Sequence, residues 1–234
     1  MTMLFYDAHL HQPGAEAGAF LVGLEGLPFF SGTMTNQDVL RLHDPAHKIF
    51  SFYYVVKQEV NQNLLHPLLK YHPRREKYTL NQVIESIGKN NPAAVMIDTL
   101  NEPFWVPYDY WELARVFPEL PVIFPHAGGY LVNDFIKICH FQRNVWIDFS
   151  LTHTVLADFG KKPKGLPYIY DAIEYSLHSP FKDRILLGSD NPFYNQEQVV
   201  EFYRREGFLD LLNRNFLNLS NQILNRIREK GNIQ

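Results

Sequence analysis

Eight short runs of apolar, β-branched and aromatic residues recur along the chain, and they restrict its fold more than any other feature. Each run is three to eight residues long, which is the length of a buried strand. Segments with helical spacing of apolar residues separate most of them, and strands that alternate with helices build parallel βαβ units. The runs are Leu4–Ala8, Phe20–Leu24, Ile49–Val56, Leu68–Tyr71, Ala94–Ile97, Val122–Phe124, Val145–Phe149 and Ile185–Leu187.

The segments between these runs carry signals for helices. Thr79 and Gln82 form the capping-box pattern that opens a helix. The last two predicted helices follow the eighth strand, so we expect extra helices at the C-terminal end of the chain. Besides the helix that opens at Thr79, the expected helices span Tyr108–Phe117, Tyr130–Phe141, Asn195–Glu206 and Phe208–Lys230.

Eight parallel strands favour a single (β/α)8 TIM barrel over residues 1–234, with these additional C-terminal helices. Residues 10–48 fit the pattern least, because strand two is short and no clear helix separates it from strand one. A doubly wound α/β sheet is the alternative fold. No glycine-rich phosphate-binding turn follows the first strand, which counts against that alternative.

Composition narrows the function classes. The net charge is −3, which argues against a dedicated nucleic-acid-binding protein. The only cysteine, Cys139, excludes an internal disulfide framework and a multi-cysteine zinc site. No Lys or Arg precedes Arg41, and no apolar run approaches the ~18 residues of a membrane span. We therefore expect a cytoplasmic protein that acts on a small molecule, contacts neither nucleic acid nor membrane, and could form a homodimer.

The most informative polar residues stand where predicted strands end, at the face where barrel enzymes keep their chemistry. His9 and His11 follow strand one and are two residues apart, so their side chains point to the same side. Two imidazoles on one side can bind one metal ion. Such a pair is a weak motif by itself, but its place at a strand end strengthens the metal-binding interpretation.

Strands six and eight end in residues suited to acid–base chemistry. His126 stands in Pro125-His-Ala-Gly-Gly129, whose glycines allow a tight turn. It is a candidate ligand, acid or base, or else a buried histidine that hydrogen-bonds the backbone. Asp190, after strand eight, can ligate a metal and accept a proton from water. Its alternative role is to cap the turn before Pro192.

Three further residues are candidate substrate contacts. His72 lies two residues after Lys70 at the end of strand four and shares its side. Arg74 follows it and could bind a substrate carboxylate. Trp105, in the loop after strand five, could form a wall of the pocket or pack against the rim of the barrel.

The motifs YDAHLHQP, KYHPR, VIFPHAGG, NVWIDFS and ILLGSDNPF occur in this order along most of the chain. The set resembles the amidohydrolase superfamily, in particular the amidohydrolase-related branch of metal-dependent barrels that includes aminocarboxymuconate semialdehyde decarboxylase. The resemblance implies that His9 and His11 bind metal and that Asp190 is both a ligand and the proton acceptor. It also implies that His126 lies by the metal as an acid, base or electrophile.

One position departs from that family pattern. Where the family usually places a histidine after strand five, this chain has Asp98. A carboxylate can also bind zinc, manganese, magnesium or iron. We therefore expect one divalent ion on His9, His11, Asp98 and Asp190, with no lysine that bridges two ions.

The expected reaction is hydrolysis of an amide, ester or lactone by water that the metal activates, with Asp190 and His126 as catalytic residues. The same site could instead decarboxylate an aromatic or unsaturated acid. A more distant alternative is a PHP-type phosphoesterase, but the chain lacks further clusters of His, Glu and Asp. The departure at Asp98 leaves open a barrel that has lost its metal and binds a ligand or partner.

Overall fold

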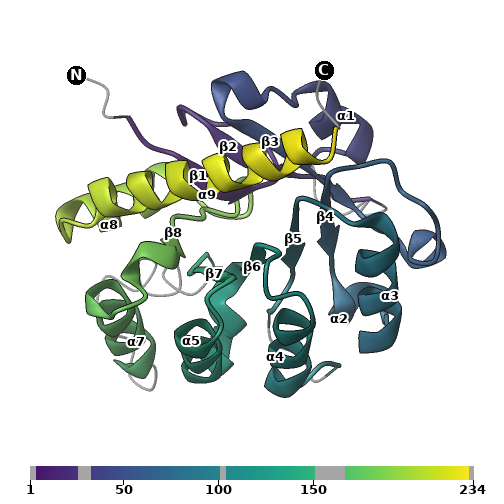
Figure 1. The fold of residues 1–234 in the computed structure, drawn as a ribbon. Coiled ribbons are helices and arrows are strands. Elements are labelled where there is room, and N and C mark those ends of the chain that lie inside the picture. Colours follow the sequence, from purple (N-terminus) through teal and green to yellow (C-terminus); the bar gives the residue numbers. More distant parts are fainter. Residues whose placement is uncertain (1–3, 26–32, 101–103, 151–166, 232–234) are drawn as a thin grey trace.

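The computed structural model describes residues 4–25, 33–100, 104–150 and 167–231. Within them, eight strands follow one another in the order β1 to β8, and each is parallel to the next (Figure 1). The TIM-barrel prediction is therefore confirmed. The strands are β1 (Asp7–Leu10), β2 (Ala19–Val22), β3 (Ile49–Tyr54), β4 (Leu68–Tyr71), β5 (Ala94–Ile97), β6 (Val122–Phe124), β7 (Val145–Asp148) and β8 (Ile185–Leu186).

Backbone hydrogen bonds close the barrel between its first and last strands. Ala8 N donates to Leu187 O at 2.7 Å, and Asp190 N donates to His9 O at 2.7 Å. Further along, His11 N donates to Asn191 O, also at 2.7 Å. The chain after β8 is thus bonded directly to the segment that carries the paired histidines.

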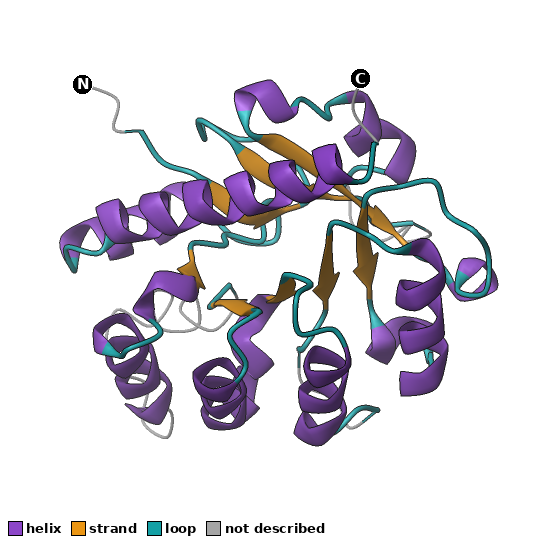
Figure 2. Cartoon of the chain, viewed as in Figure 1, coloured by secondary structure: helices purple, strands orange, loops and turns teal. Residues whose placement is uncertain are grey.

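The helices lie outside the strands (Figure 2). The capping box at the start of α3 is confirmed, because the Thr79 hydroxyl accepts from Gln82 N at 3.3 Å and the Gln82 side chain accepts from Thr79 N at 3.0 Å. The helices are α1 (Asn36–Arg41), α2 (Pro73–Glu76), α3 (Leu80–Asn90), α4 (Pro107–Val116), α5 (Val132–Phe141), α7 (Pro167–His178), α8 (Gln196–Arg205) and α9 (Leu209–Glu229).

The first third of the chain differs in detail from the prediction. Strand one was expected over Leu4–Ala8, but β1 begins at Asp7, because pairing with β2 joins Asp7 to Ala19 and Leu10 to Leu21. His9 therefore lies within the strand rather than after it. Residues 11–18 connect β1 to β2 without a helix, and α1 comes only after β2.

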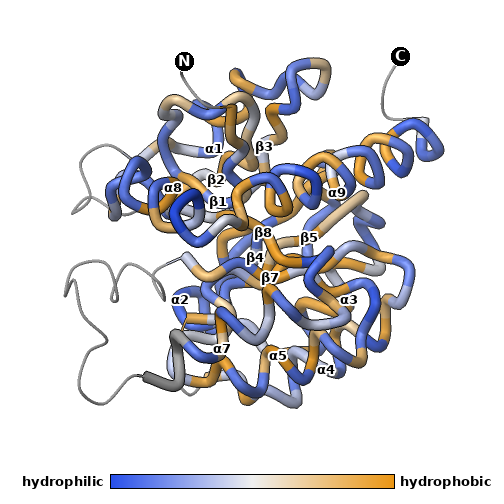
Figure 3. The backbone as a smooth tube through the Cα atoms, turned by 90° about the vertical axis from the view of Figure 1, so that its left-hand side faces the viewer, coloured by the Kyte–Doolittle hydropathy of each residue, from blue (hydrophilic) through white to orange (hydrophobic). Residues whose placement is uncertain are grey.

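Helix α9 closes the end of the barrel opposite the candidate site. Phe216 on α9 packs against Phe20 of β2 with ring centroids 4.6 Å apart, and the two belong to one buried cluster with barrel residues such as Leu68. Arg226 donates to Ala93 O at 3.1 Å, just before β5 begins. Apolar and polar stretches alternate along α9 (Figure 3). Helix α9, the last of the C-terminal helices expected from the sequence, thus covers the apolar interior.

Among the described residues, no helix has both the length and the apolar composition needed to cross a membrane.

Candidate active site

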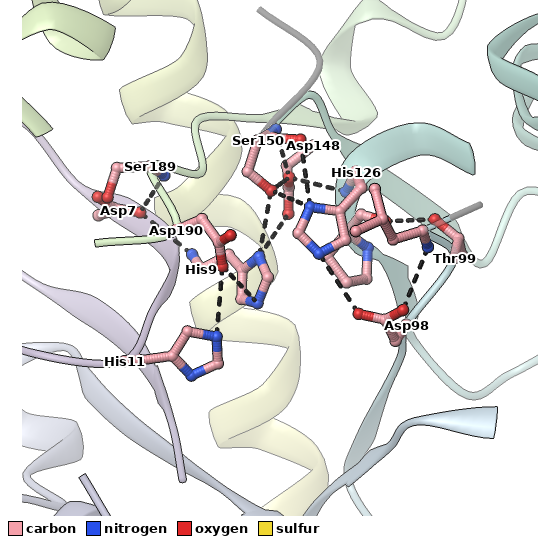
Figure 4. Close-up of polar contacts among 12 residues, drawn as sticks. Asp7, His9, His11, Asp98, Thr99, His126, Asp148, Ser150, Ser189 and Asp190 are labelled. Atoms are coloured by element: carbon pink, nitrogen blue, oxygen red, sulfur yellow. Dashed lines mark hydrogen bonds and ion pairs between the residues drawn. The ribbon is translucent and has the colours of Figure 1, made fainter. Parts of the chain in front are cut away.

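Six ionisable side chains gather at the C-terminal ends of the strands (Figure 4). They come from five different strands or the segments directly after them, and each is at most 4% exposed. Such a density of buried ionisable groups is typical of functional sites. The six are His9, His11, Asp98, His126, Asp148 and Asp190.

Three of these residues can hold a metal ion. His9 Nε2 lies 3.6 Å and His11 Nε2 lies 3.3 Å from Asp190 Oδ1. One ligand atom from each of the three lies within 4.8 Å of the others. His9 Nε2 is buried and forms no hydrogen bond within the described part of the chain. The paired histidines and the strand-eight aspartate predicted from the sequence therefore come together, although their binding of a metal stays a prediction.

The Nδ1 atoms of His9 and His11 each have a hydrogen-bond partner that holds the ring. His11 Nδ1 lies 2.9 Å from Val22 O, and because a carbonyl only accepts, Nδ1 must carry the hydrogen. His9 Nδ1 lies 3.1 Å from Ser150 Oγ. A neutral imidazole protonated at Nδ1 presents its Nε2 lone pair, and metal-binding histidines are commonly fixed in this way.

Ser150 and Asp148 hold the rings of His9 and His126. The sequence predicted a role for neither residue. The Ser150 hydroxyl donates to Asp148 Oδ1, which also accepts from Ser150 N at 2.8 Å and from His126 N at 3.1 Å. Ser150 Oγ lies 2.9 Å from His126 Nδ1. Because its own hydrogen is used on Asp148, this hydroxyl accepts from both His9 and His126. The two residues end strand seven, so the rule applied to the other strand ends could have found them.

Asp7 forms a second set of hydrogen bonds that holds the strand of the histidine pair in place. Asp7 Oδ1 accepts from His9 N at 3.1 Å and from Ser189 N at 3.0 Å, and Gln196 Nε2 donates to Asp7 Oδ2 at 2.9 Å. Burial raises the pKa of Asp7 to about 7, although these hydrogen bonds oppose the rise. Asp7 therefore joins the backbone of β1 to the segment after β8.

Asp98 lies in the same mouth but beside other partners. Its Oδ2 is 3.4 Å from His126 Nε2, 3.5 Å from His72 Nε2 and 4.0 Å from Lys70 Nζ. Its Oδ1 accepts from Leu100 N at 3.1 Å, in its own turn. Neither candidate metal group, His9–His11–Asp190 or His9–His126–Asp148, includes Asp98. Its role as a ligand stays a prediction.

His126 and Asp190 both have left-handed backbone conformations, with φ of 67° and 61°. Such a conformation is unfavourable for residues other than glycine and concentrates at functional sites. In the turn after β6, a Cβ on Gly128 would lie 2.1 Å from the Phe135 ring, so only glycine fits there. The local backbone therefore holds both candidate catalytic residues in unusual conformations.

Burial and neighbouring charges set the ionisation of these groups. Burial raises the pKa of Asp190, but His11 and His126 outweigh it and leave the pKa below its ordinary value. Burial lowers the pKa of His126, but Asp98, Asp190 and Asp148 outweigh it and leave that pKa raised. The site thus favours an ionised Asp190 beside a protonated His126. Burial holds the pKa of His9 well below its usual range, as suits a neutral ligand.

The three residues expected to contact the substrate lie in different surroundings. His72 joins the Asp98 cluster, and Arg74 lies on α2 next to it. Trp105 is buried in the hydrophobic core, where its ring nitrogen donates to Tyr78 O at 3.0 Å and its ring packs against Tyr110. These contacts fit the packing alternative considered for Trp105, and its role as a wall of the pocket stays a prediction. His153, which follows strand seven, lies outside the described residues.

Comparisons with known proteins identify the family of this chain. The amidohydrolase family model matches residues 85–230, which is more than half of the chain. The chain therefore belongs to the amidohydrolase family, and it is an enzyme of that type. No protein of curated function matches it.

Solved structures show the same fold. An uncharacterised TIM-barrel protein from Bordetella bronchiseptica is 14% identical with a TM-score of 0.66, covering 94% of this chain and 99% of that one. A probable 2-pyrone-4,6-dicarboxylic acid hydrolase from Acinetobacter baumannii, with citric acid bound, is 14% identical with a TM-score of 0.60, covering 94% and 100%. A protein given the same assignment from Pseudomonas putida is 14% identical with a TM-score of 0.58, covering 93% and 97%.

Proposed function

We propose that this enzyme hydrolyses a carbonyl ester of a small molecule, with a lactone as the preferred substrate class. The observation that carries the proposal is the convergence of His9 Nε2 and His11 Nε2 on Asp190 Oδ1, at 3.6 Å and 3.3 Å. Both rings are anchored through Nδ1, so both present Nε2 to the same carboxylate oxygen. Amides and open-chain esters share the carbonyl chemistry and are the next candidates.

The residues of the mouth fit a divalent metal ion. His9 Nε2 is a buried nitrogen whose lone pair no described residue satisfies, and such an atom needs a partner. Two imidazoles and a carboxylate are ligands that zinc, manganese and iron accept. We propose His9, His11 and Asp190 as the core of the set, with Asp98 as the fourth ligand expected from the sequence. When bound, the ion would lower the pKa of a water molecule and polarise the substrate carbonyl.

The chain's own residues then move the protons. Asp190 is ionised at neutral pH and accepts a proton from the attacking water, whose oxygen forms a bond to the carbonyl carbon. As the bond between that carbon and the leaving oxygen breaks, protonated His126 donates its proton to the leaving oxygen. Asp98 stabilises the charged form of His126 until that transfer. Water is thereby added across the ester bond.

The names of two neighbouring structures support the lactone preference. Both are assigned to hydrolysis of a 2-pyrone, which is a cyclic unsaturated ester. The likeness to them at 14% identity concerns the fold, so the substrate itself has to be tested on this chain.

The test is a panel of small lactones, aryl esters and amides, with turnover followed by acid release. Carbon dioxide release from aromatic and unsaturated acids is measured in parallel. We expect acid release from lactones, lost in Asp190→Asn and kept in the exposed-surface control Asp134→Asn. Carbon dioxide release without any hydrolysis would replace the proposal with decarboxylation.

A further inference from the structure

The ammonium group of Lys70 lies in the mouth and has no part in the proposed mechanism. Lys70 lies on β4 and is 1% exposed. Its Nζ forms no hydrogen bond within the described part of the chain. The shortest ion-pair distance is 4.0 Å, to Asp98 Oδ2, which is too long for a hydrogen bond. The three donors of this ammonium group are therefore buried without an acceptor among the described residues.

An unpartnered buried ammonium is costly, because burial removes the water that would otherwise solvate the charge. Asp98 does not relieve this cost fully, since the same Oδ2 faces His72 and His126 at 3.5 Å and 3.4 Å. Burial lowers the pKa of Lys70; the charges of Asp98, Asp190 and Asp148 oppose this, yet none of them accepts a hydrogen bond from its Nζ. The donors point to an acceptor that binds from outside.

The chain places a second cation beside this one. Arg74 is half-buried on α2, close enough for its charge to act on Lys70 and His72. Within the described ranges Arg74 forms no ion pair, unlike Arg75, which pairs with Glu76. Lysine and arginine together can bind both oxygens of a carboxylate.

We propose that Lys70, with Arg74, binds a carboxylate carried by the substrate, so that the preferred substrate is an anionic lactone or ester. This inference rests on the proposed function for the reaction that the substrate undergoes. The binding of the carboxylate does not depend on that function. The carboxylate would complete the hydrogen bonding of Lys70 and fix the reacting carbonyl on the side of Asp98, next to His126. Lys70 is then a substrate-binding residue that decides between charged and neutral substrates.

The experiment measures binding by calorimetry on the full chain with a small panel of carboxylates, headed by isophthalate, and with isophthalamide as its neutral counterpart. Lys70→Met keeps the aliphatic stem and removes the charge. Lys137→Met, on the surface of α5, is the matched control. Each titration is repeated after treatment with a chelator, because a bound metal ion could itself hold a carboxylate.

We expect wild-type protein to prefer isophthalate over isophthalamide, and Lys70→Met to weaken isophthalate binding by about 10- to 100-fold, as for a lost charge-assisted hydrogen bond. Isophthalamide binding and the control variant should be unaffected, with or without chelator. If Lys70→Met does not fold, Arg74→Met serves as the second variant and should weaken isophthalate binding as well.

Equal affinity of wild type and a folded Lys70→Met for isophthalate would overturn the inference, and so would a wild type that binds no carboxylate of the panel. The two proposals fail separately. Carboxylate binding through Lys70 without turnover of any ester would contradict the function alone. Turnover of neutral and anionic lactones at equal rates, unchanged in Lys70→Met, would contradict the carboxylate site alone.

Discussion

The hydroxyl oxygen of Ser150 lies 3.1 Å from Nδ1 of His9 and accepts its hydrogen. Because Ser150 donates its own hydrogen to Asp148, it cannot donate to the ring. It accepts from His126 Nδ1 in the same way, at 2.9 Å. Ser150 thereby fixes which nitrogen of His9 is protonated, and its hydroxyl and backbone oxygens both lie within hydrogen-bond distance of His126 Nδ1.

Ser150→Ala should release the His9 ring from this constraint, whereas His126 Nδ1 keeps the backbone oxygen of residue 150 as an acceptor at 3.2 Å. We expect nitrogen-15 NMR of His9 to show a mixture of Nδ1-H and Nε2-H forms in place of the Nδ1-H form. Turnover or metal affinity should fall by about 10- to 100-fold, as for other anchors of metal-binding histidines. Ser150→Thr keeps the hydroxyl and should restore both readouts. Unchanged tautomers in folded Ser150→Ala would contradict the anchoring role.

The pH dependence of kcat/KM should follow the two shifted groups. The pKa of Asp190 is held below 3.8, so the base stays ionised in mildly acidic solution. The pKa of His126 is raised above 6.5, so the acid loses its proton only above that value. Activity should therefore persist at acidic pH and decline as the pH rises through the raised pKa of His126.

Asp98→Asn separates the two possible roles of Asp98. Without the carboxylate, the pKa of His126 should fall, and the alkaline decline of kcat/KM should move to lower pH. If Asp98 is also a metal ligand, the same variant will bind metal more weakly. An unmoved pH profile with full metal retention would show that Asp98 has neither role.

His126→Asn tests the proposed acid. A general acid usually contributes about 10²- to 10⁴-fold to the rate, so turnover should fall by that factor. Metal content, measured by elemental analysis, should stay at the wild-type level. Loss of the metal in this variant would instead make His126 a ligand, as in the alternative group with His9 and Asp148.

The closure of the barrel by α9 predicts a stability effect far from the site. Phe216 is 1% exposed and packs on Phe20. Phe216→Ala should lower the free energy of unfolding by about 3–5 kcal/mol, the usual cost of removing a buried phenylalanine. Asn218→Ala, on the exposed face of α9, is the control and should change it little. Denaturant unfolding measures both, and equal stability of the two variants would contradict the role of α9.

The fold could be predicted from the sequence because short buried strands and helical segments alternate, and parallel strands place their C-terminal ends at one face. The same rule brought His9, His11, His126 and Asp190 together. It could not fix the start of β1, since the apolar run Leu4–Ala8 is as strand-like as Asp7–Leu10, and only pairing with β2 decides between them.

The hydrogen-bond partners of the site residues could not be predicted from the sequence. Lys70 and His72 were expected on one side of β4, but spacing does not reveal that no described residue accepts a hydrogen bond from Lys70. The hydrogen bonds of Ser150 to two histidines from other strands depend on tertiary structure alone. Trp105 was expected at the pocket, and its alternative contact with Tyr78 becomes visible only when the loop is placed.

Metal content of the double variant His9→Ala with His11→Ala tests the central claim most directly. Wild-type protein purified without chelator should carry about one divalent ion per chain, and circular dichroism should show the same folded barrel in both proteins. The account predicts that the double variant contains no bound ion and cannot be reloaded. A folded double variant with the metal content of the wild type would contradict it.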